Sequence, residues 1–308
     1  MKVVITGANS AVGRAILRGS AEGAAPVTFV AAVRSDRAAS ELQPSSARIG
    51  RVARISYDDQ KSLRTAFSEA TAVVHLAGVL VERPGSSYEE ANVETTRRVA
   101  EAAKASAVEK LVYVSAIGAN EASANRYWRT KGEAEALVRS SGVSYTVLRV
   151  PRLLGRGTEG AAALQRSLDR QRAILIGGGR SLQQPLLVDD LARAATRSAD
   201  GGVARDRTLN LAGPISLPDR EIVERAASLL GRQVRVWSIP KGLAWCALAV
   251  RQRFSRRGFS TDALQVITAD TKVDPQPAAT ELGIRLAGLD EMIRQSVDEG
   301  WRASQEHP

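Results

Sequence analysis

The 308-residue sequence contains one cysteine, Cys246, and two histidines, His75 and His307. A single cysteine excludes a disulfide framework and a cysteine-based zinc site, and it is typical of a reducing compartment. With so few histidines we predict no metal site. No apolar run approaches the roughly 20 residues that a membrane-spanning helix requires, and no secretory signal precedes the first strand-like segment. We therefore expect a cytoplasmic protein.

Aromatic residues make up only 4% of the chain, too few for a surface that stacks nucleic-acid bases. Lysine is also scarce, with seven among 43 basic residues, so arginine carries most of the net charge of +10. The arginines are scattered from Arg14 to Arg302, which is typical of general surface residues rather than of a nucleic-acid interface. We expect no nucleic-acid partner.

The first 150 residues alternate short apolar runs with alanine-rich segments of helical spacing. This alternation predicts the α/β class, with a Rossmann-type, doubly wound parallel sheet. The strands are expected over 2–6, 27–33, 51–55, 72–76, 110–115 and 144–150, and the helices over 12–19, 62–69, 88–105 and 127–141.

The pattern loosens after Pro151, and Asp189 and Asp190 resemble capping residues at the start of a helix. We predict a nucleotide-binding domain over 1–150. Residues 151–308 are predicted to supply the remaining sheet elements and a smaller C-terminal α/β lobe that binds substrate. Helices are expected over 161–172, 188–198, 217–230 and 289–301, and strands near 174–179 and 208–212.

A strand, a glycine turn and a helix follow one another at the start of the chain, the context of a dinucleotide-binding motif. Gly7 permits the tight turn, and Gly13 allows the helix to pack closely on the strand. Ser10 replaces a middle glycine, but its hydroxyl can donate to a phosphate oxygen. A purely structural glycine turn is the alternative. The candidate cofactor-binding residues are Thr6, Gly7, Asn9, Ser10, Ala11, Val12 and Gly13.

The second predicted strand ends in Arg34 and Ser35, with no acidic residue at its tip. An acid at this position binds the 2′-hydroxyl of NAD, whereas an arginine accommodates the 2′-phosphate of NADP. We therefore expect NADP(H) to be favoured over NAD(H), with Arg37 as a second candidate contact. The alternative is that Arg34 is an ordinary solvated arginine.

Three residues form a candidate catalytic site: Ser115 at the end of the fifth strand, and Tyr127 and Lys131 one helical turn apart. A tyrosine, with a pKa of about 10, needs a neighbouring cation to act as an acid–base catalyst near neutral pH. We expect Lys131 to supply that cation and to hold the nicotinamide ribose. Ser115 is expected to hydrogen-bond the substrate at its reacting carbon.

Several segments together resemble the extended or atypical short-chain dehydrogenase/reductases, a group that includes the NAD-dependent epimerases and dehydratases. The segments 114–119, 127–135 and 148–151 are similar to bacterial relatives of the NADPH-binding accessory subunit of respiratory complex I. The broader resemblance also rests on 6–13, 75–78, Asn92 and 184–190.

This resemblance implies further site residues. It places Leu76, Ala77 and Gly78 under the adenine ribose and pyrophosphate. Ser56 and Tyr57 would flank the adenine, although the family commonly has aspartate in place of Ser56. Val150 and Pro151 would border the nicotinamide. Asn92 is either near the site or an ordinary polar helix residue.

The segment 240–257 combines an apolar helix with Arg251, Arg253, Arg256 and Arg257. Such a helix can lie at the inner face of a membrane, with its arginines on anionic head groups. The alternative is a helix packed on the core, with arginines near its C-terminus. The first interpretation favours a lipophilic, quinone-like substrate, and the second favours a soluble nucleotide sugar or carbonyl compound. The sequence indicates no oligomeric state.

Two functional hypotheses follow. In the first, the protein transfers hydride between NADP(H) and a carbonyl or hydroxyl group of a small molecule, using Ser115, Tyr127 and Lys131. In the second, it is a non-catalytic subunit that holds NADPH, like the complex I subunit that it resembles.

Overall fold

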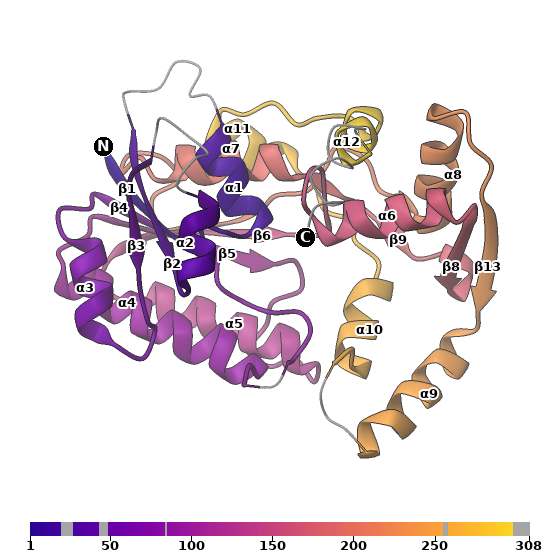
Figure 1. Cartoon of the computed structure of the whole chain (residues 1–308), viewed down its shortest axis with the longest axis horizontal. Coiled ribbons are helices and arrows are strands. Elements are labelled where there is room, and N and C mark those ends of the chain that lie inside the picture. The colour runs from indigo at the N-terminus through magenta and orange to yellow at the C-terminus, as the bar shows by residue number, and fades with distance from the viewer. Residues whose placement is uncertain (20–26, 43–48, 84, 255–257, 298–308) are drawn as a thin grey trace.

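The computed structural model describes residues 1–19, 27–42, 49–83, 85–254 and 258–297. A seven-stranded sheet lies at its centre, with strand order β11-β6-β5-β4-β1-β2-β3 and every neighbouring pair parallel (Figure 1). The order reverses between β1 and β4, which confirms the predicted doubly wound sheet. The strands are β1 (Lys2–Thr6), β2 (Thr28–Val33), β3 (Ile49–Arg54), β4 (Ala72–His75), β5 (Lys110–Ala116), β6 (Ser144–Val150) and β11 (Arg207–Asn210).

Helices cover both faces of the sheet, which is why its strands are apolar without interruption. In β1, Val3 and Ile5 pack on one face while Val4 packs on the other, and all three are fully buried. The first face carries α1 (Ala11–Arg18), α2 (Asp36–Leu42), α7 (Val188–Ser198) and α11 (Gln276–Leu282), and the second carries α3 (Gln60–Phe67), α4 (Thr95–Ala105) and α5 (Arg126–Arg139).

Two local features differ from the sequence expectation. The helix expected over 88–105 begins with a π-helical turn, η1 (Glu89–Glu94), in which the Thr95 amide donates to the Glu90 carbonyl. Asp190 does not cap α7, which begins after Leu187 without a side-chain cap. The Asp190 side chain instead accepts a hydrogen bond from the Ala287 amide at 2.8 Å, fixing a segment nearly one hundred residues away.

The second lobe has its own apolar core, formed mainly by α6, α8 and α12. Three two-stranded sheets complete it: β7 with β10, β9 with β12, and β8 with β13. The elements are β7 (Leu153–Leu154), α6 (Glu159–Asp169), β8 (Arg172–Ile176), η2 (Gly177–Gly179), β9 (Leu182–Gln183), β10 (Leu186–Leu187), β12 (Leu217–Pro218), α8 (Asp219–Leu229), β13 (Arg235–Ile239), α9 (Lys241–Phe254), α10 (Thr261–Thr268) and α12 (Leu289–Ser296).

Helix α9 extends away from both cores and returns to the body through α10 (Figure 1). None of the α9 side chains that the structure describes is buried, which contradicts the alternative in which this helix packs on the core. Arg256 and Arg257 lie outside the described residues. Within the described chain, no helix has both the length and the apolar character to cross a bilayer.

Candidate functional site

The glycine turn after β1 presents donors suited to an anion. Gly7 has a φ of 77°, and a β-carbon at Gly13 would lie 2.4 Å from the Ala8 carbonyl oxygen, so glycine is required for the close approach of α1. Ser10 caps α1 by accepting from the Gly13 amide at 3.1 Å, which leaves its own hydroxyl hydrogen available. The amides of Ala11 and Val12 have no acceptor among the described residues. These donors fit a pyrophosphate.

Arg34 follows β2 at the same edge of the sheet. Its side chain is exposed and has no ion-pair partner within the described residues. The predicted helper Arg37 instead pairs with Glu41 at 3.1 Å, and the Ser35 hydroxyl accepts from the Ala38 amide at the start of α2. Arg34 is therefore available to meet a phosphate, while its neighbours stabilise α2.

Ser56 and Tyr57 follow the next strand, β3. The Ser56 hydroxyl accepts from the Asp58 amide at 3.3 Å and so closes a local turn. The Tyr57 ring lies edge-on to His75, with 6.3 Å between ring centroids. Burial raises the pKa of Tyr57, and the hydrogen bond with Thr6 and the charge of Arg34 oppose that shift. Tyr57 thus lies near both the His75 ring and the Arg34 cation.

A buried polar chain connects β1 to the helix that covers β4. His75 Nδ1 lies 2.7 Å from Thr6 Oγ1, and its Nε2 lies 3.2 Å from Thr96 Oγ1. The Thr96 hydroxyl donates to the Asn92 carbonyl at 2.6 Å. Burial, together with the charge of Lys131, lowers the pKa of His75 to about 3. His75 is therefore a neutral structural residue at neutral pH.

Asn92, in the π-helical turn, lies beside Gly78 and Lys131. Its side-chain oxygen accepts from the Val79 amide at 3.1 Å, and its side-chain nitrogen donates to the Thr130 hydroxyl at 3.0 Å. A β-carbon at Gly78 would lie 2.9 Å from that oxygen and 3.4 Å from Lys131 Nζ. The backbone after β4 thus lies against the polar side chains of Asn92 and Lys131.

Lys131 is buried and donates to the Tyr113 hydroxyl at 2.7 Å and to the Val114 carbonyl at 2.9 Å. Burial lowers the pKa of Lys131 to about 7, although the Glu135 carboxylate opposes the shift. The ammonium group is thus held by β5 and not by Tyr127.

The low pKa of Lys131 predicts a pH-dependent stability. Between about pH 7 and the ordinary value of 10.5, the unfolded chain binds one proton more at this lysine than the folded chain. The free energy of unfolding should therefore rise with pH in this range, by at most about 1.4 kcal/mol per pH unit, relative to Lys131→Met. Urea unfolding of both proteins across this range tests it. Parallel pH profiles would contradict the low pKa.

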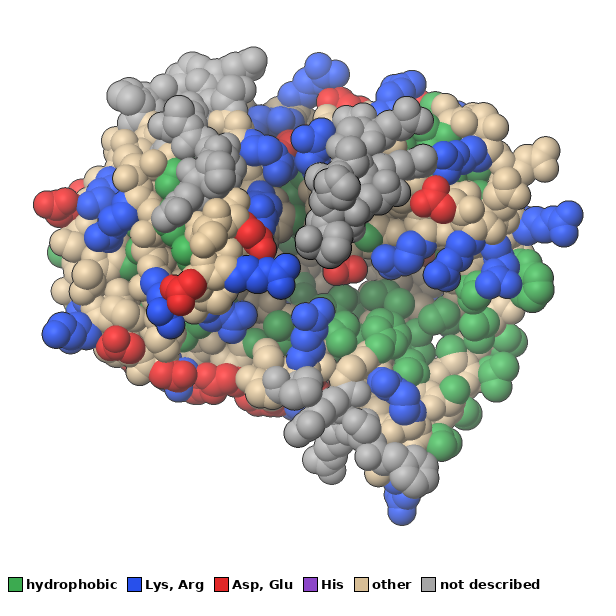
Figure 2. Space-filling view, viewed as in Figure 1, with side chains coloured by type: hydrophobic (Ala, Val, Ile, Leu, Met, Phe, Trp, Pro, Cys, Tyr) green, Lys and Arg blue, Asp and Glu red, His purple; other side chains and the backbone are tan. Residues whose placement is uncertain are grey.

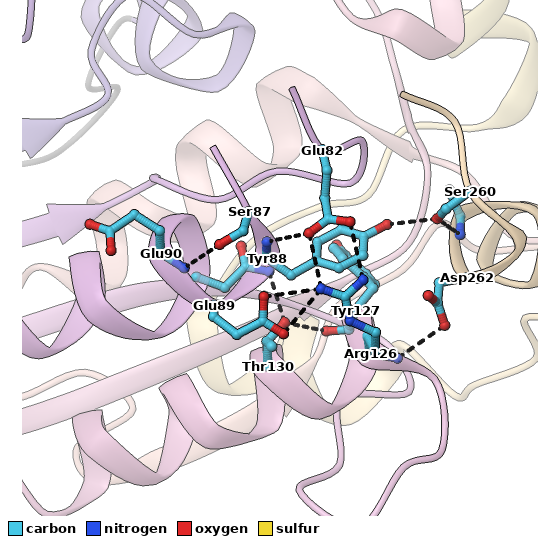
Figure 3. Close-up of polar contacts among 12 residues, drawn as sticks. Glu82, Ser87, Tyr88, Glu89, Glu90, Arg126, Tyr127, Thr130, Ser260 and Asp262 are labelled. Atoms are coloured by element: carbon cyan, nitrogen blue, oxygen red, sulfur yellow. Dashed lines mark hydrogen bonds and ion pairs between the residues drawn. The ribbon is translucent and has the colours of Figure 1, made fainter. Parts of the chain in front are cut away.

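Tyr127 lies on the same face of α5 as Lys131, one helical turn before it. Its ring lies edge-on to Tyr88, with 5.8 Å between centroids (Figure 3). Its hydroxyl has no hydrogen-bond partner among the described residues. Burial, followed by the influence of Tyr88, raises the pKa of Tyr127. This differs from the expectation that Lys131 favours the phenolate. The phenol stays protonated at neutral pH, which suits a proton donor.

A polar cluster holds this end of α5 (Figure 3). Arg126 pairs with Glu82 at 3.1 Å and with Glu89 at 3.1 Å, and its guanidinium lies 5.4 Å from the centre of the Tyr88 ring. The Arg126 amide donates to the Asp262 side chain at 3.1 Å. This cluster fixes Tyr127 between η1 and the segment that begins α10.

No contact among the described residues joins Ser115 to the Tyr127 hydroxyl. Its own hydroxyl is buried and donates to the Glu135 carboxylate at 2.6 Å. Glu135, fully buried, also accepts from Arg149 at 2.6 Å and from Arg139 at 3.3 Å. The structure therefore places Ser115 in an ion-pair network between β5, β6 and α5.

Sequence reasoning missed Tyr113 and Glu135 as partners of the site. Alternation along β5 gives Tyr113 and Ser115 the same face, which is the face covered by α5. Helical spacing gives Tyr127, Lys131 and Glu135 one common stripe, toward that face. The two periodicities combined could have found both contacts.

The remaining candidates lie where β4 and β6 end. Leu76 and Ala77 are half-buried after β4, and a β-carbon at Gly7 would lie in ordinary van der Waals contact with Leu76, 3.5 Å from its β-carbon. Val150, which ends β6, is buried and Pro151 is half-buried. Across the described part of the chain, no three histidine, cysteine or acidic side chains gather in a way that could hold a metal ion.

Comparison with known families and curated proteins gives a consistent result. Residues 7–174 match the family model described as NAD(P)H-binding. The mitochondrial NADH dehydrogenase [ubiquinone] 1 alpha subcomplex subunit 9 of Arabidopsis thaliana is 27% identical over 241 residues, which cover 73% of this chain. The chain spans 60% of the length of that relative.

Solved structures share the fold over nearly the whole chain. MoeE5 in complex with UDP-glucose and NAD has a TM-score of 0.72 and 22% identity, covering 99% of this chain and 100% of that chain. The NADPH-dependent quinone oxidoreductase QOR2 from Escherichia coli, complexed with NADPH, has a TM-score of 0.72 and 21% identity, covering 94% of this chain and 98% of that chain. Similar folds therefore hold either dinucleotide.

Proposed function

Because the chain belongs to the NAD(P)H-binding family, we propose that it is an NADP(H)-dependent oxidoreductase that acts on a carbonyl or hydroxyl group of a small molecule. The predicted resemblance to the extended short-chain dehydrogenase/reductases is confirmed by its relatives and fold. The observation that supports catalysis is the protonated Tyr127 hydroxyl, which no described residue hydrogen-bonds, one helical turn before a lysine that lies against Gly78.

The cofactor, when bound, supplies or accepts the hydride. Ser10 and the amides of Ala11 and Val12 would hold its pyrophosphate. Lys131 and the neighbouring Asn92 would anchor its nicotinamide ribose. Val150 and Pro151 would border the nicotinamide, with Ser56 and Tyr57 at the adenine.

Tyr127 would donate a proton to the substrate oxygen in the reduction direction and accept one in the reverse direction. To orient the substrate as proposed, the Ser115 hydroxyl must give up its hydrogen bond to the Glu135 carboxylate and hydrogen-bond the substrate instead. Oxidation of NADPH, followed by absorbance, with a panel of carbonyl compounds and quinones tests this function. Nucleotide sugars should be included in the same panel.

We expect Arg34→Ala to weaken NADPH binding by about tenfold or more while leaving NADH binding within about twofold, since one charge-assisted contact to a 2′-phosphate is lost. Fluorescence titration with both nucleotides measures the change. Arg64→Ala, which removes an exposed arginine from α3, is the matched control. Equal losses for both nucleotides would contradict a specific 2′-phosphate contact.

A non-catalytic, nucleotide-holding subunit is the second candidate, and the engagement of Ser115 by Glu135 favours it. In this case the nucleotide should copurify with the protein and stabilise it by mass action, without being oxidised by any compound of the panel. Slow nucleotide exchange combined with no turnover would favour this role, whereas turnover would eliminate it.

A further inference from the structure

An apolar surface runs from the β8–β13 pair onto α9. Ile174 and Trp237 are register partners on the two strands, and their side chains are 52% and 57% exposed. On α9, Leu243, Trp245 and Val250 are between 56% and 63% exposed. Figure 2 shows hydrophobic side chains gathered over this projecting part of the molecule. We call these five residues the α9 surface.

The dimensions of α9 limit what can cover this surface. An apolar helix of 14 residues is about 21 Å long, shorter than the roughly 30 Å hydrocarbon core of a bilayer. Helix α9 is therefore too short to cross a membrane, and none of its described side chains is buried in a core of the protein. Contiguous exposed apolar side chains of this kind mark an interaction site in a soluble domain.

The charges around the α9 surface indicate that its partner is negatively charged. The sequence from 241 to 257 contains no acidic residue. Lys241 and Arg253 on α9, and Arg172 on β8, have no carboxylate partner among the described residues. The Arg172 guanidinium lies 5.4 Å from the centre of the Trp237 ring. Exposed tryptophans with adjacent, unpaired cations are typical of a lipid interface, where rings meet head groups and basic side chains reach anionic phosphates.

We propose that the α9 surface docks on an anionic phospholipid bilayer. Leu243 and Val250 lie on one flank of α9 and Trp245 lies on the other, so both flanks of the helix enter the interface, and Lys241, Arg253 and Arg172 contact the phosphates. This docking does not depend on the proposed reaction.

The segment that follows α9 is joined to the Tyr127 end of α5. The Gly258 amide donates to the Glu82 carbonyl at 2.9 Å, and Ser260 Oγ lies 3.2 Å from the Tyr88 hydroxyl. Asn125, the N-cap of α5, donates to the Asp262 carbonyl at 3.0 Å. These contacts anchor the C-terminal end of α9, and the pairing of β13 with β8 holds the segment before its N-terminal end.

Flotation of the full chain with vesicles of phosphatidylcholine, with or without phosphatidylglycerol, tests the proposal. The protein should float with the anionic vesicles and remain behind with the neutral ones. The double variant Lys241→Gln/Arg253→Gln should lower the partition coefficient about 25-fold, because each cation near the surface contributes about fivefold. Leu243→Ser/Trp245→Ser should lower it by more than about tenfold.

Two control variants match these changes. Ile215→Ser replaces an exposed apolar side chain elsewhere, and Arg64→Gln removes an exposed cation from α3; neither should change flotation. Equal binding to neutral and anionic vesicles, or no binding to either, would overturn the proposal. So would a concentration-dependent dimer that Leu243→Ser/Trp245→Ser abolishes without any vesicle binding. NADPH titration of each variant verifies the fold and tests the nucleotide site separately.

Discussion

Tyr127→Phe should lower kcat by about 100- to 10,000-fold, the usual contribution of a positioned proton donor. NADPH should still bind with an affinity within about twofold of the original, because the substitution removes only a hydroxyl and keeps the ring. That ring packs against Tyr88, and the hydroxyl has no protein partner among the described residues. The folded state therefore loses no described hydrogen bond.

Steady-state kinetics with the best substrate of the panel, paired with NADPH titration, measure this effect. Tyr145→Phe, a half-buried tyrosine on β6 away from the site, is the control and should leave kcat within about twofold. Unchanged turnover in Tyr127→Phe would eliminate the proposed proton donor. Loss of NADPH binding would instead indicate that the hydroxyl supports the cofactor site.

Glu135→Ala should lower the free energy of unfolding by about 3 kcal/mol, because the buried Ser115 hydroxyl and the partly buried Arg149 guanidinium both lose their acceptor. Glu135 is fully buried and joins Arg149 and Arg139 to the Ser115 hydroxyl. Its carboxylate also raises the pKa of the Arg149 guanidinium by hydrogen bonding. The alanine variant leaves Ser115, Arg149 and Arg139 without this shared acceptor.

Urea unfolding measures the change, with Glu133→Ala as the control on the same helix. Glu133 is half-buried and lies 3.8 Å from Arg129, so its removal should change stability by less than about 1 kcal/mol. Equal losses in both variants would show that the Glu135 network contributes no more than a surface ion pair.

The parallel sheet was predictable because each strand is a short apolar run between helices, and β1 and β6 begin and end where the sequence places them. The short helix α2 was missed. It contains only seven residues, of which Ala38 and Leu42 are buried, too few for a clear helical period. The position of α9 could not be predicted either, since an apolar helix with terminal arginines has the same sequence pattern whether it is buried or exposed.

The candidate site was only partly predictable. The glycine turn and the spacing of Tyr127 and Lys131 depend on neighbouring residues and can be read locally. The partner of Ser115 depends on which face of β5 is covered, and the cluster around Arg126 joins Glu82 to Asp262 across 180 positions. The Arg126 cluster is decided by tertiary packing and carries no local signal, whereas the partner of Ser115 could be found only by combining the periodicity of β5 with that of α5.

The π-helical turn that carries Asn92 has a consequence for comparing this chain with others. A π-helical turn holds one residue more than an α-helical turn over the same axial distance. Each residue of a regular helix rotates the next side chain by about 100°. A relative that lacks this additional residue would keep α4 packed on the sheet but present a neighbouring position to Gly78. Equivalence at Asn92 must therefore be assigned by spatial superposition, because an ungapped alignment through the helix would shift it by one residue.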